Sequence, residues 1–135
     1  MDRKLEFSTD LDNELGLVLV RARGAMNYEN ATEVSLRARE EATMHGYGVF
    51  FDFRAVTLDS SLAEMVRFPH ESPSTTNEAL RKPKCAVLVR DDKDLDFWRH
   101  FEEATQKAGL RDKVFVEDER AALEWASGKS VSESG

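Results

Sequence analysis

The sequence has very few of the residues that mark secreted or membrane proteins. It holds a single cysteine, Cys85, which cannot form an intrachain disulfide, so a disulfide framework is excluded and a cytoplasmic location is expected. No apolar run approaches the roughly 18–20 residues that a membrane-spanning helix needs. The first ten residues, MDRKLEFSTD, lack the apolar stretch of a signal peptide. A soluble cytoplasmic protein is therefore predicted.

Basic residues are also in the minority. Nineteen Lys and Arg face 26 Asp and Glu, which gives a net charge of -7, and no basic run offsets it. Such a chain repels a phosphate backbone, so nucleic-acid binding is not expected. With 135 residues, of which 41% are hydrophobic, the chain suits one globular domain. We expect that domain over residues 1–127 and a disordered polar tail over 128–135.

Apolar segments alternate with amphipathic ones along the chain. The order predicts an α/β fold with a five-stranded, mostly parallel sheet, an antiparallel N-terminal edge strand and about four helices. Asn27 and Gly46 mark the ends of the clearest helix. The predicted strands are 4–9, 15–21, 49–53, 85–89 and 114–116; the predicted helices are 28–45, a short one from about 60 to Pro69, 91–108 and 119–126, with one more turn at 77–81.

Asp52 interrupts the apolar strand at 49–53. Alternation puts Phe50, Asp52 and Arg54 on one face of that strand. If the strands run parallel, their carboxyl edge also carries Arg21, Arg23, Arg90 and Asp91, and such edges bind ligands in open α/β sheets. Two interpretations remain: a small anion pocket floored by arginines, or, as we favour, a carboxylate that accepts bonds from Arg54, Arg90 or loop amides.

Residues 68–83 form an irregular stretch that holds all three prolines. Structureless segments of this length within a compact domain are often lids or binding loops. Trp98, Phe101 and Trp125 have helical spacing and are predicted to lie in the core. A minority interpretation lets them line an apolar cavity together with Phe68.

Few residues have the spacing of a catalytic or metal site. His45, His70 and His100 are scattered, and the acidic run 92–96 departs from a calcium loop because Phe97 replaces the required glycine. Nucleophile-elbow, P-loop and dinucleotide-binding patterns are missing. Since Cys85 heads an apolar strand, it suits a buried small residue better than a nucleophile. We expect no enzyme activity and no cofactor.

The segment Asp59-Ser60-Ser61 follows the strand at 49–53 by six residues. A helix N-cap is the simpler role for these side chains, because their oxygens accept the free N–H groups of a first turn. A phosphorylation switch is the other role, since a phosphate there would meet the positive end of a helix dipole and alter a docked surface. The capping role is favoured on chemistry alone.

Together with the element order, Phe51-Asp52-Phe53 followed by Asp59-Ser60-Ser61-Leu62 resembles the STAS domains of sulfate transporters and anti-sigma factor antagonists. These domains share the SpoIIAA-like fold, so the resemblance implies an α/β domain of SpoIIAA-like type. In the bacterial antagonists the second serine is phosphorylated and the next helix docks a kinase, so Ser61 corresponds to the phospho-acceptor. The strands FDFR and AVLV and the helices FWRHFEEA and ALEWA resemble a bacterial branch of small STAS and CRAL-TRIO-like proteins. This resemblance spans residues 3–127, and its CRAL-TRIO side implies a carrier of apolar ligands.

The sequence thus predicts a non-enzymatic binding or regulatory module that docks a protein partner. An alternative is a carrier of a small apolar or amphipathic ligand beneath the 68–83 loop. An exposed edge strand also makes a homodimer plausible. The predicted partner or ligand surface consists of Asp52, Arg54, Asp59, Ser60, Ser61 and Arg90, with Ser61 as the candidate phospho-acceptor.

Overall fold

The computed structural model describes residues 5–59 and 78–131. Within these ranges five strands and four helices follow one another in the predicted order. The short helix expected near residues 60–69 lies outside the described residues. The elements are β1 (Glu6–Asp12), β2 (Leu17–Met26), α1 (Tyr28–His45), β3 (Gly48–Leu58), α4 (Glu78–Arg81), β4 (Lys84–Val89), α5 (Leu95–Lys107), β5 (Arg111–Val116) and α6 (Glu119–Ser127).

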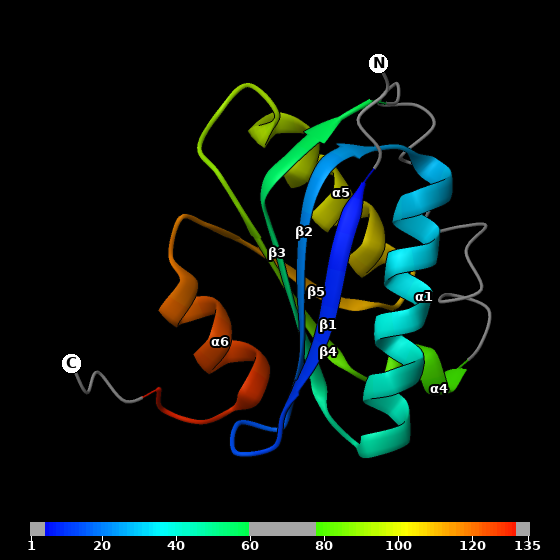
Figure 1. Cartoon of the computed structure of the whole chain (residues 1–135), viewed down its shortest axis with the longest axis vertical. Coiled ribbons are helices and arrows are strands. Elements are labelled where there is room, and N and C mark those ends of the chain that lie inside the picture. Colours follow the sequence, from blue (N-terminus) through cyan, green and yellow to red (C-terminus); the bar gives the residue numbers. More distant parts are fainter. Residues whose placement is uncertain (1–4, 60–77, 132–135) are drawn as a thin grey trace.

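The strands form one sheet in the order β1-β2-β3-β4-β5 (Figure 1). β1 pairs antiparallel with β2, and each later strand runs parallel to its neighbour. The predicted five-stranded architecture with an antiparallel N-terminal edge strand is therefore confirmed. A tight turn joins β1 to β2, in which Gly16 adopts a left-handed conformation (φ 69°) and donates its N–H to the Asp12 carbonyl.

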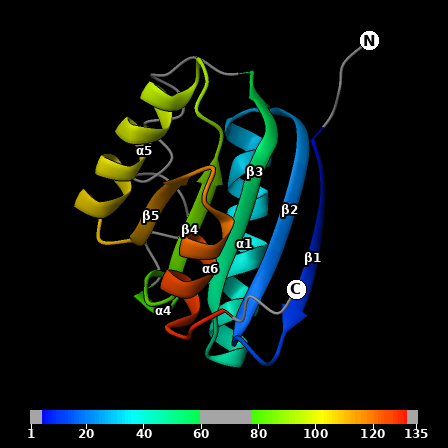
Figure 2. The same ribbon diagram turned by 90° about the vertical axis from the view of Figure 1, so that its left-hand side faces the viewer.

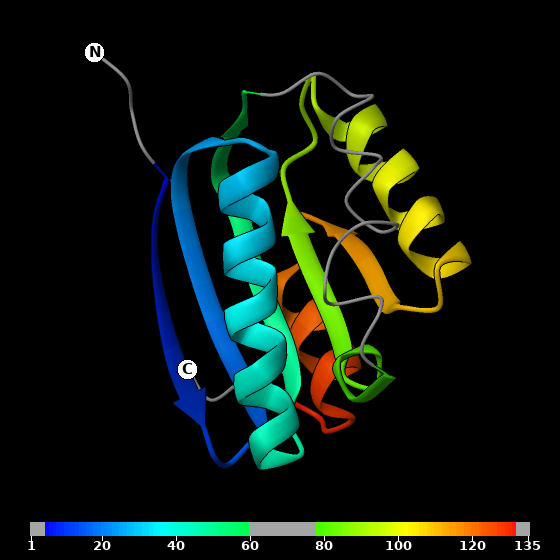
Figure 3. The same ribbon diagram turned by 90° about the vertical axis from the view of Figure 1, so that its right-hand side faces the viewer.

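Helices cover the two faces of the sheet unequally. α1 and α5 lie on one face, and α6 lies on the other (Figures 1 and 3). The larger core cluster forms under α1 and α5, where Val49, Phe51 and Trp98 are buried. A smaller cluster lies between α6 and the sheet around Phe50 and Leu88. The central strands are thus buried on both faces, which fits their nearly continuous apolar sequences.

α1 begins and ends where its sequence predicted. Asn27 is the N-cap and accepts the Asn30 N–H, while the Asn30 side chain accepts the Asn27 N–H in return. At the other end Gly46 adopts a left-handed conformation (φ 70°). Val34, Ala38 and Ala42 form the buried stripe of the helix.

The buried face of α1 also carries a charge that the apolar pattern did not reveal. Arg39 is 1% exposed and donates two hydrogen bonds from Nη2 to the Asp112 carboxylate of β5, at 2.8 and 3.0 Å. Its Nε donates to the Ser35 hydroxyl at 2.9 Å. Although burial disfavours the guanidinium charge, the Asp112 carboxylate raises the pKa of Arg39 above its usual value. This ion pair joins α1 to β5 across the core.

Two central strands are longer than predicted. β2 continues past residue 21 to Met26, and β3 continues past residue 53 to Leu58, so residues 54–58 are strand rather than the expected loop. The two extensions pair with each other, which satisfies backbone groups that a loop would expose to water. Gly24, with φ 107°, follows a register shift in this part of the ladder.

α5 is shorter than predicted, and its buried side includes residues beyond the predicted Trp98 and Phe101. It starts at Leu95 rather than at residue 91, and Asp94 at the N-cap makes no side-chain capping bond. Phe97 and Thr105 join Trp98 and Phe101 on its buried side, whereas Ala104 and Ala108 are half-exposed. The aromatic residues determine the buried face because they remove more apolar area from water than alanine does.

The two edges of the sheet differ. At β5, side chains of α5 bond to the outward backbone groups: Gln106 Nε2 donates to the Asp112 carbonyl at 2.9 Å, and Glu102 Oε2 accepts the Val114 N–H at 2.7 Å. At β1 the outward N–H and C=O groups between Glu6 and Leu11 bond to no residue in the described ranges. The β5 edge is therefore closed to strand pairing and the β1 edge is open.

α6 packs directly on the start of β3. A Cβ atom at Gly48 would lie 2.6 Å from the Ala126 carbonyl oxygen and 3.2 Å from that of Lys84. After α6, the backbone turns at Gly128, and Lys129 Nζ donates to the Glu14 carbonyl at 2.7 Å. Residues 132–135 of the predicted disordered tail lie outside the described residues.

The close approach at Gly48 predicts a stability loss for Gly48→Ala. Both atoms that the new methyl group meets first belong to backbone, so α6 must move away from the sheet. We expect the free energy of unfolding to fall by about 1–3 kcal/mol, measured by urea denaturation. Ser8→Ala, an exposed change on β1, should stay within about 0.5 kcal/mol of wild type. An unchanged midpoint for Gly48→Ala would contradict the packing of α6.

The buried ion pair predicts a double-mutant effect. Arg39→Met or Asp112→Leu alone leaves one charge buried without a partner and should cost about 3–5 kcal/mol of unfolding free energy. The double variant removes both charges and should be more stable than either single variant, as judged by the same denaturation. Arg37→Met, at an exposed arginine on the same helix, serves as the control and should cost less than about 1 kcal/mol. Additive losses would show that the two side chains do not interact.

Candidate functional site

α6 covers only part of its face of the sheet. It packs over the N-terminal halves of the parallel strands, where Leu17, Phe50 and Ala86 are buried against Ala122 and Ala126. Figure 2 shows that none of the helices in the described ranges lies over the far halves of β2 and β3 or over β1 on this side. The apolar residues stop at that boundary, and charged side chains replace them along the same strands.

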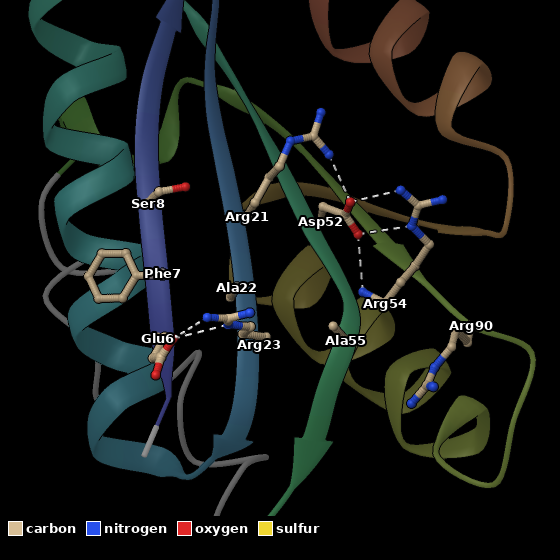
Figure 4. A pocket seen from close by; sticks show the side chains of 10 residues that line it. All are labelled: Glu6, Phe7, Ser8, Arg21, Ala22, Arg23, Asp52, Arg54, Ala55 and Arg90. Carbon is tan, nitrogen blue, oxygen red and sulfur yellow. Dashed lines mark hydrogen bonds and ion pairs between the residues drawn. The ribbon is translucent and has the colours of Figure 1, made fainter. Parts of the chain in front are cut away.

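These charged side chains line a groove of about 640 Å³, which we call the arginine groove (Figure 4). It extends from the open edge of the sheet at β1, across β2 and β3, to the residue that follows β4. Ala22 and Ala55 are the small residues of its lining and leave space between the longer side chains. The lining residues are Glu6, Phe7, Ser8, Arg21, Ala22, Arg23, Asp52, Arg54, Ala55 and Arg90.

Asp52 lies between two arginines on the floor of this groove (Figure 4). Its Oδ2 accepts Arg21 Nη1 at 2.9 Å and Arg54 Nη2 at 2.8 Å. Its Oδ1 accepts both Nε and the backbone N–H of Arg54, at 3.0 and 3.2 Å. Each carboxylate oxygen therefore has at least two donors. The favoured interpretation of Asp52 as a paired strand end is consistent with this geometry, although Arg21, rather than Arg90, is the second partner.

The environment of Asp52 favours its charged form. Burial raises the pKa of Asp52, but the hydrogen bonds from Arg54 and the charges of Arg54 and Arg21 lower it by more, so the pKa lies below the ordinary 3.8. Asp52 is consequently a carboxylate at neutral pH. It holds the two guanidinium groups in place on adjacent strands.

The remaining arginines of the groove also contact carboxylates. Arg23 donates from Nε and Nη2 to one oxygen of Glu6, at 3.0 and 2.8 Å. Arg90 lies 3.2 Å from Asp92, and Arg54 donates to Glu119 of α6 at 2.9 Å. Arginines of β2, β3 and the segment after β4 thus line the groove, and carboxylates of β1, β3, that segment and the start of α6 pair with them.

A bulge in β3 sets the positions of Arg54 and Ala55. Arg21 pairs with Asp52 and Arg23 with Ala55, so β3 has one residue more than β2 over this interval. Phe53 and Val56 both face the core under α1 and α5, which turns the two residues between them to the groove side. Bulges of this kind often redirect side chains next to binding sites.

The structure brings together part of the predicted surface. Asp52, Arg54 and Arg90 line one groove with Arg21 and Arg23, as expected for the carboxyl edge of parallel strands. Asp59 lies beyond the end of β3, donates its N–H to the Met26 carbonyl, and does not line the groove. Ser60 and Ser61 lie outside the described residues, so their capping and phospho-acceptor roles stay predictions.

Sequence reasoning missed two carboxylates of the site, Glu6 and Glu119. Glu6 pairs directly with Arg23 across the β1–β2 hairpin. Its position could have been found by extending the predicted hairpin register by a few residues. Glu119 is the first residue of α6, a common place for an acidic side chain, and its role at Arg54 depends on how α6 lies on the sheet.

The apolar cavity of the carrier alternative is small among the described residues. A pocket of about 30 Å³ lies between α1 and α5, with Trp98, Phe101 and Met26 in its walls and Arg39 at one side. That volume holds roughly one water molecule. Phe68 and most of the 68–83 loop lie outside the described residues, so the carrier prediction stays untested.

Residues 5–59 and 78–131 show neither a metal-binding cluster nor a membrane-spanning helix. They contain no cluster of three His, Cys, Asp or Glu side chains arranged to hold a metal ion. Nor does this part of the chain include a helix with the length and apolarity to cross a membrane.

Comparison with known proteins does not identify a family. None of the models of known protein families matches the sequence, and no curated protein matches it. The resemblance to STAS domains therefore stays a prediction.

The lowered pKa of Asp52 predicts a pH-dependent effect of Asp52→Asn. Above pH 3.8 the Asp52 carboxyl is ionised in both the folded and the unfolded protein, so its charge interactions in the folded protein contribute fully to stability. This contribution is lost as the pH falls through the lower pKa of the folded protein. Asp52→Asn should therefore cost about 1–3 kcal/mol at pH 7, and this cost should shrink below about pH 4. Urea denaturation of both proteins between pH 7 and 3 measures it. A constant difference over that range would contradict the pairing of Asp52.

Proposed function

We propose that this chain is a non-enzymatic, STAS-like binding module of the cytoplasm that docks a protein partner in the arginine groove. The partner would present Asp or Glu side chains to the groove. The observation that carries this proposal is the gathering of Arg21, Arg23, Arg54 and Arg90 on a half-face that no described helix covers, in a chain of net charge -7.

The arginines have donors left for a partner. Each guanidinium group has five N–H donors in a fixed plane. Arg21 uses one terminal nitrogen for its bond to Asp52, and Arg90 uses one for Asp92. Because carboxylates already hold these side chains, less side-chain entropy is lost when a partner binds. Arginine is also among the residues that contribute most to protein interfaces.

The chemistry of the groove supports docking rather than acid–base catalysis. A general acid or base works best with a pKa near the operating pH, whereas Arg54 and Arg21 hold the pKa of Asp52 below its usual value. The sole thiol of the chain is equally unsuited to attack a substrate, since burial raises the pKa of Cys85 to about 12.

The alternative function, a carrier of a small apolar ligand, has less support. The pocket beside Trp98 and Phe101 has a volume of about 30 Å³, while drug-sized ligands occupy sites of roughly 300–1,000 Å³. We therefore place the docking proposal first.

A capture experiment with matched charge variants tests the proposal. Arg23→Ala/Arg90→Ala removes two groove arginines whose side chains are 75% and 45% exposed and do not contact Asp52. The control Arg37→Ala/Arg99→Ala makes the same charge change at exposed helix positions outside the groove. Wild type and the control should retain the same protein from an extract of the producing cells, and the groove variant should retain at least about tenfold less by quantitative mass spectrometry.

Two results would contradict this function. Equal recovery by the groove variant and the control would remove the groove as the docking surface. A small molecule that stays bound to the wild-type protein in native mass spectrometry, with no protein recovered, would favour the carrier alternative.

A further inference from the structure

The open edge of β1 offers a second contact next to the arginine groove. The groove is lined at this end by Glu6, Phe7 and Ser8 of β1, so it opens directly onto the sheet edge. Alternate residues of an edge strand direct their N–H and C=O groups away from the sheet. In β1 these groups have no partner among the described residues, whereas at β5 Gln106 and Glu102 occupy the equivalent positions.

The acidic and the uncharged apolar side chains of β1 lie on opposite faces of the strand. Glu6, Asp10 and Asp12 face the groove side, where their cross-strand partners are Arg23, Leu19 and Leu17. Between residues 5 and 16 the chain has four carboxylates and no basic residue. Glu6 is paired with Arg23, and Asp10 has no ionic partner in the described ranges. A strand added at this edge would meet mainly negative charge on the groove side.

The other face of β1 is largely uncharged. Phe7 packs on the core cluster under α1, and Leu11 is 38% exposed, one of two large hydrophobic residues in the described ranges with an exposed side chain. A strand beside β1 would cover Leu11 with its own uncharged side chains. Alternation along a strand then requires basic residues toward the groove and uncharged residues toward α1.

We propose that the β1 edge accepts an extended segment of a partner protein, in which basic residues alternate with uncharged ones, as a sixth strand of the sheet. Main-chain hydrogen bonds between the segment and β1 supply the affinity. The basic side chains of the segment, which lie opposite Asp10 and Asp12, supply the specificity. The inference extends the proposed function, since the same partner would also place carboxylates over the arginine groove.

A second copy of this chain fits the edge less well. In an antiparallel pair of two β1 strands, residues of the groove side oppose one another, and three of the four are acidic. Centring the pair on Thr9, for example, brings Glu6 opposite Asp12 in both halves. Like charges directly opposite each other destabilise such pairs. The second copy also offers no free β5 edge.

A blocked nine-residue peptide that alternates lysine with valine and threonine is the probe. We expect it to bind the whole protein, measured by fluorescence anisotropy, and to shift the backbone amide resonances of Glu6–Asp12 in ¹⁵N spectra. A peptide of the same composition with its lysines in one block should bind at least about tenfold more weakly, because it cannot pair in register with the β1 carboxylates.

Two N-methylated peptides separate strand pairing from simple charge attraction. One peptide is N-methylated at its even positions and the other at its odd positions. Because only alternate N–H groups of an added strand face β1, only one of the two peptides loses the N–H groups that bond to β1. One peptide should lose at least about tenfold in affinity and the other should bind like the parent. Equal binding by both peptides, or no binding by the parent, would overturn strand addition.

Protein variants locate the contact and separate it from the groove. Asp10→Asn should weaken peptide binding, whereas Asp96→Asn, the same change at an exposed position on α5, should not. Arg23→Ala/Arg90→Ala should still bind the peptide, so strand addition and groove docking can fail independently. Sedimentation that reveals a dimer which the peptide dissociates would assign the edge to a second copy and overturn the proposed occupant.

Discussion

The parallel pairing of β3 with β2 on one side and β4 on the other determines where the rest of the molecule lies. Phe50 and Phe51 are buried on opposite faces of β3, so each face needs its own cover. α1 and α5 cover one face, and α6, with nine residues, covers only the start of the other. The uncovered remainder is where strands leave the apolar core and carry Arg21, Asp52 and Arg54. The arginine groove thus follows from the short length of α6 as much as from the residues that line it.

The Arg39–Asp112 pair and the cluster around Asp52 have different roles in the structure. Arg39 and Asp112 are buried together and join a helix to an edge strand, where water cannot replace either partner. The cluster of Asp52, Arg54 and Arg21 lies at the surface of the sheet. The guanidinium groups of both arginines remain accessible to other molecules there. The first cluster therefore contributes to the arrangement of α1 and β5, and the second orders a surface. The two clusters contain the same residue types and differ in burial.

Much of the fold could be predicted because local signals coincide with the tertiary structure. Asn27 and Gly46 bound α1 in the sequence as they do in the structure, and the apolar runs at 49–53 and 85–89 both form buried strands. The pairing of Asp52 with Arg54 followed from alternation on one strand. The Arg39–Asp112 pair could not be predicted, because 73 residues separate its members and neither breaks the local pattern. The bulge at Arg54 and the contact of Glu119 likewise depend on how neighbouring elements align, which periodicity within one segment does not encode.

The unequal edges of the sheet limit how far strand pairing can extend. A sheet with two free edges can accept copy after copy and grow into a fibre, because each addition exposes a new edge of the same kind. Here α5 blocks one end of the sheet through Gln106 and Glu102. A chain of copies joined through β1 to β5 therefore cannot propagate, and a complex formed at β1 ends with its first occupant unless that occupant brings a free edge of its own.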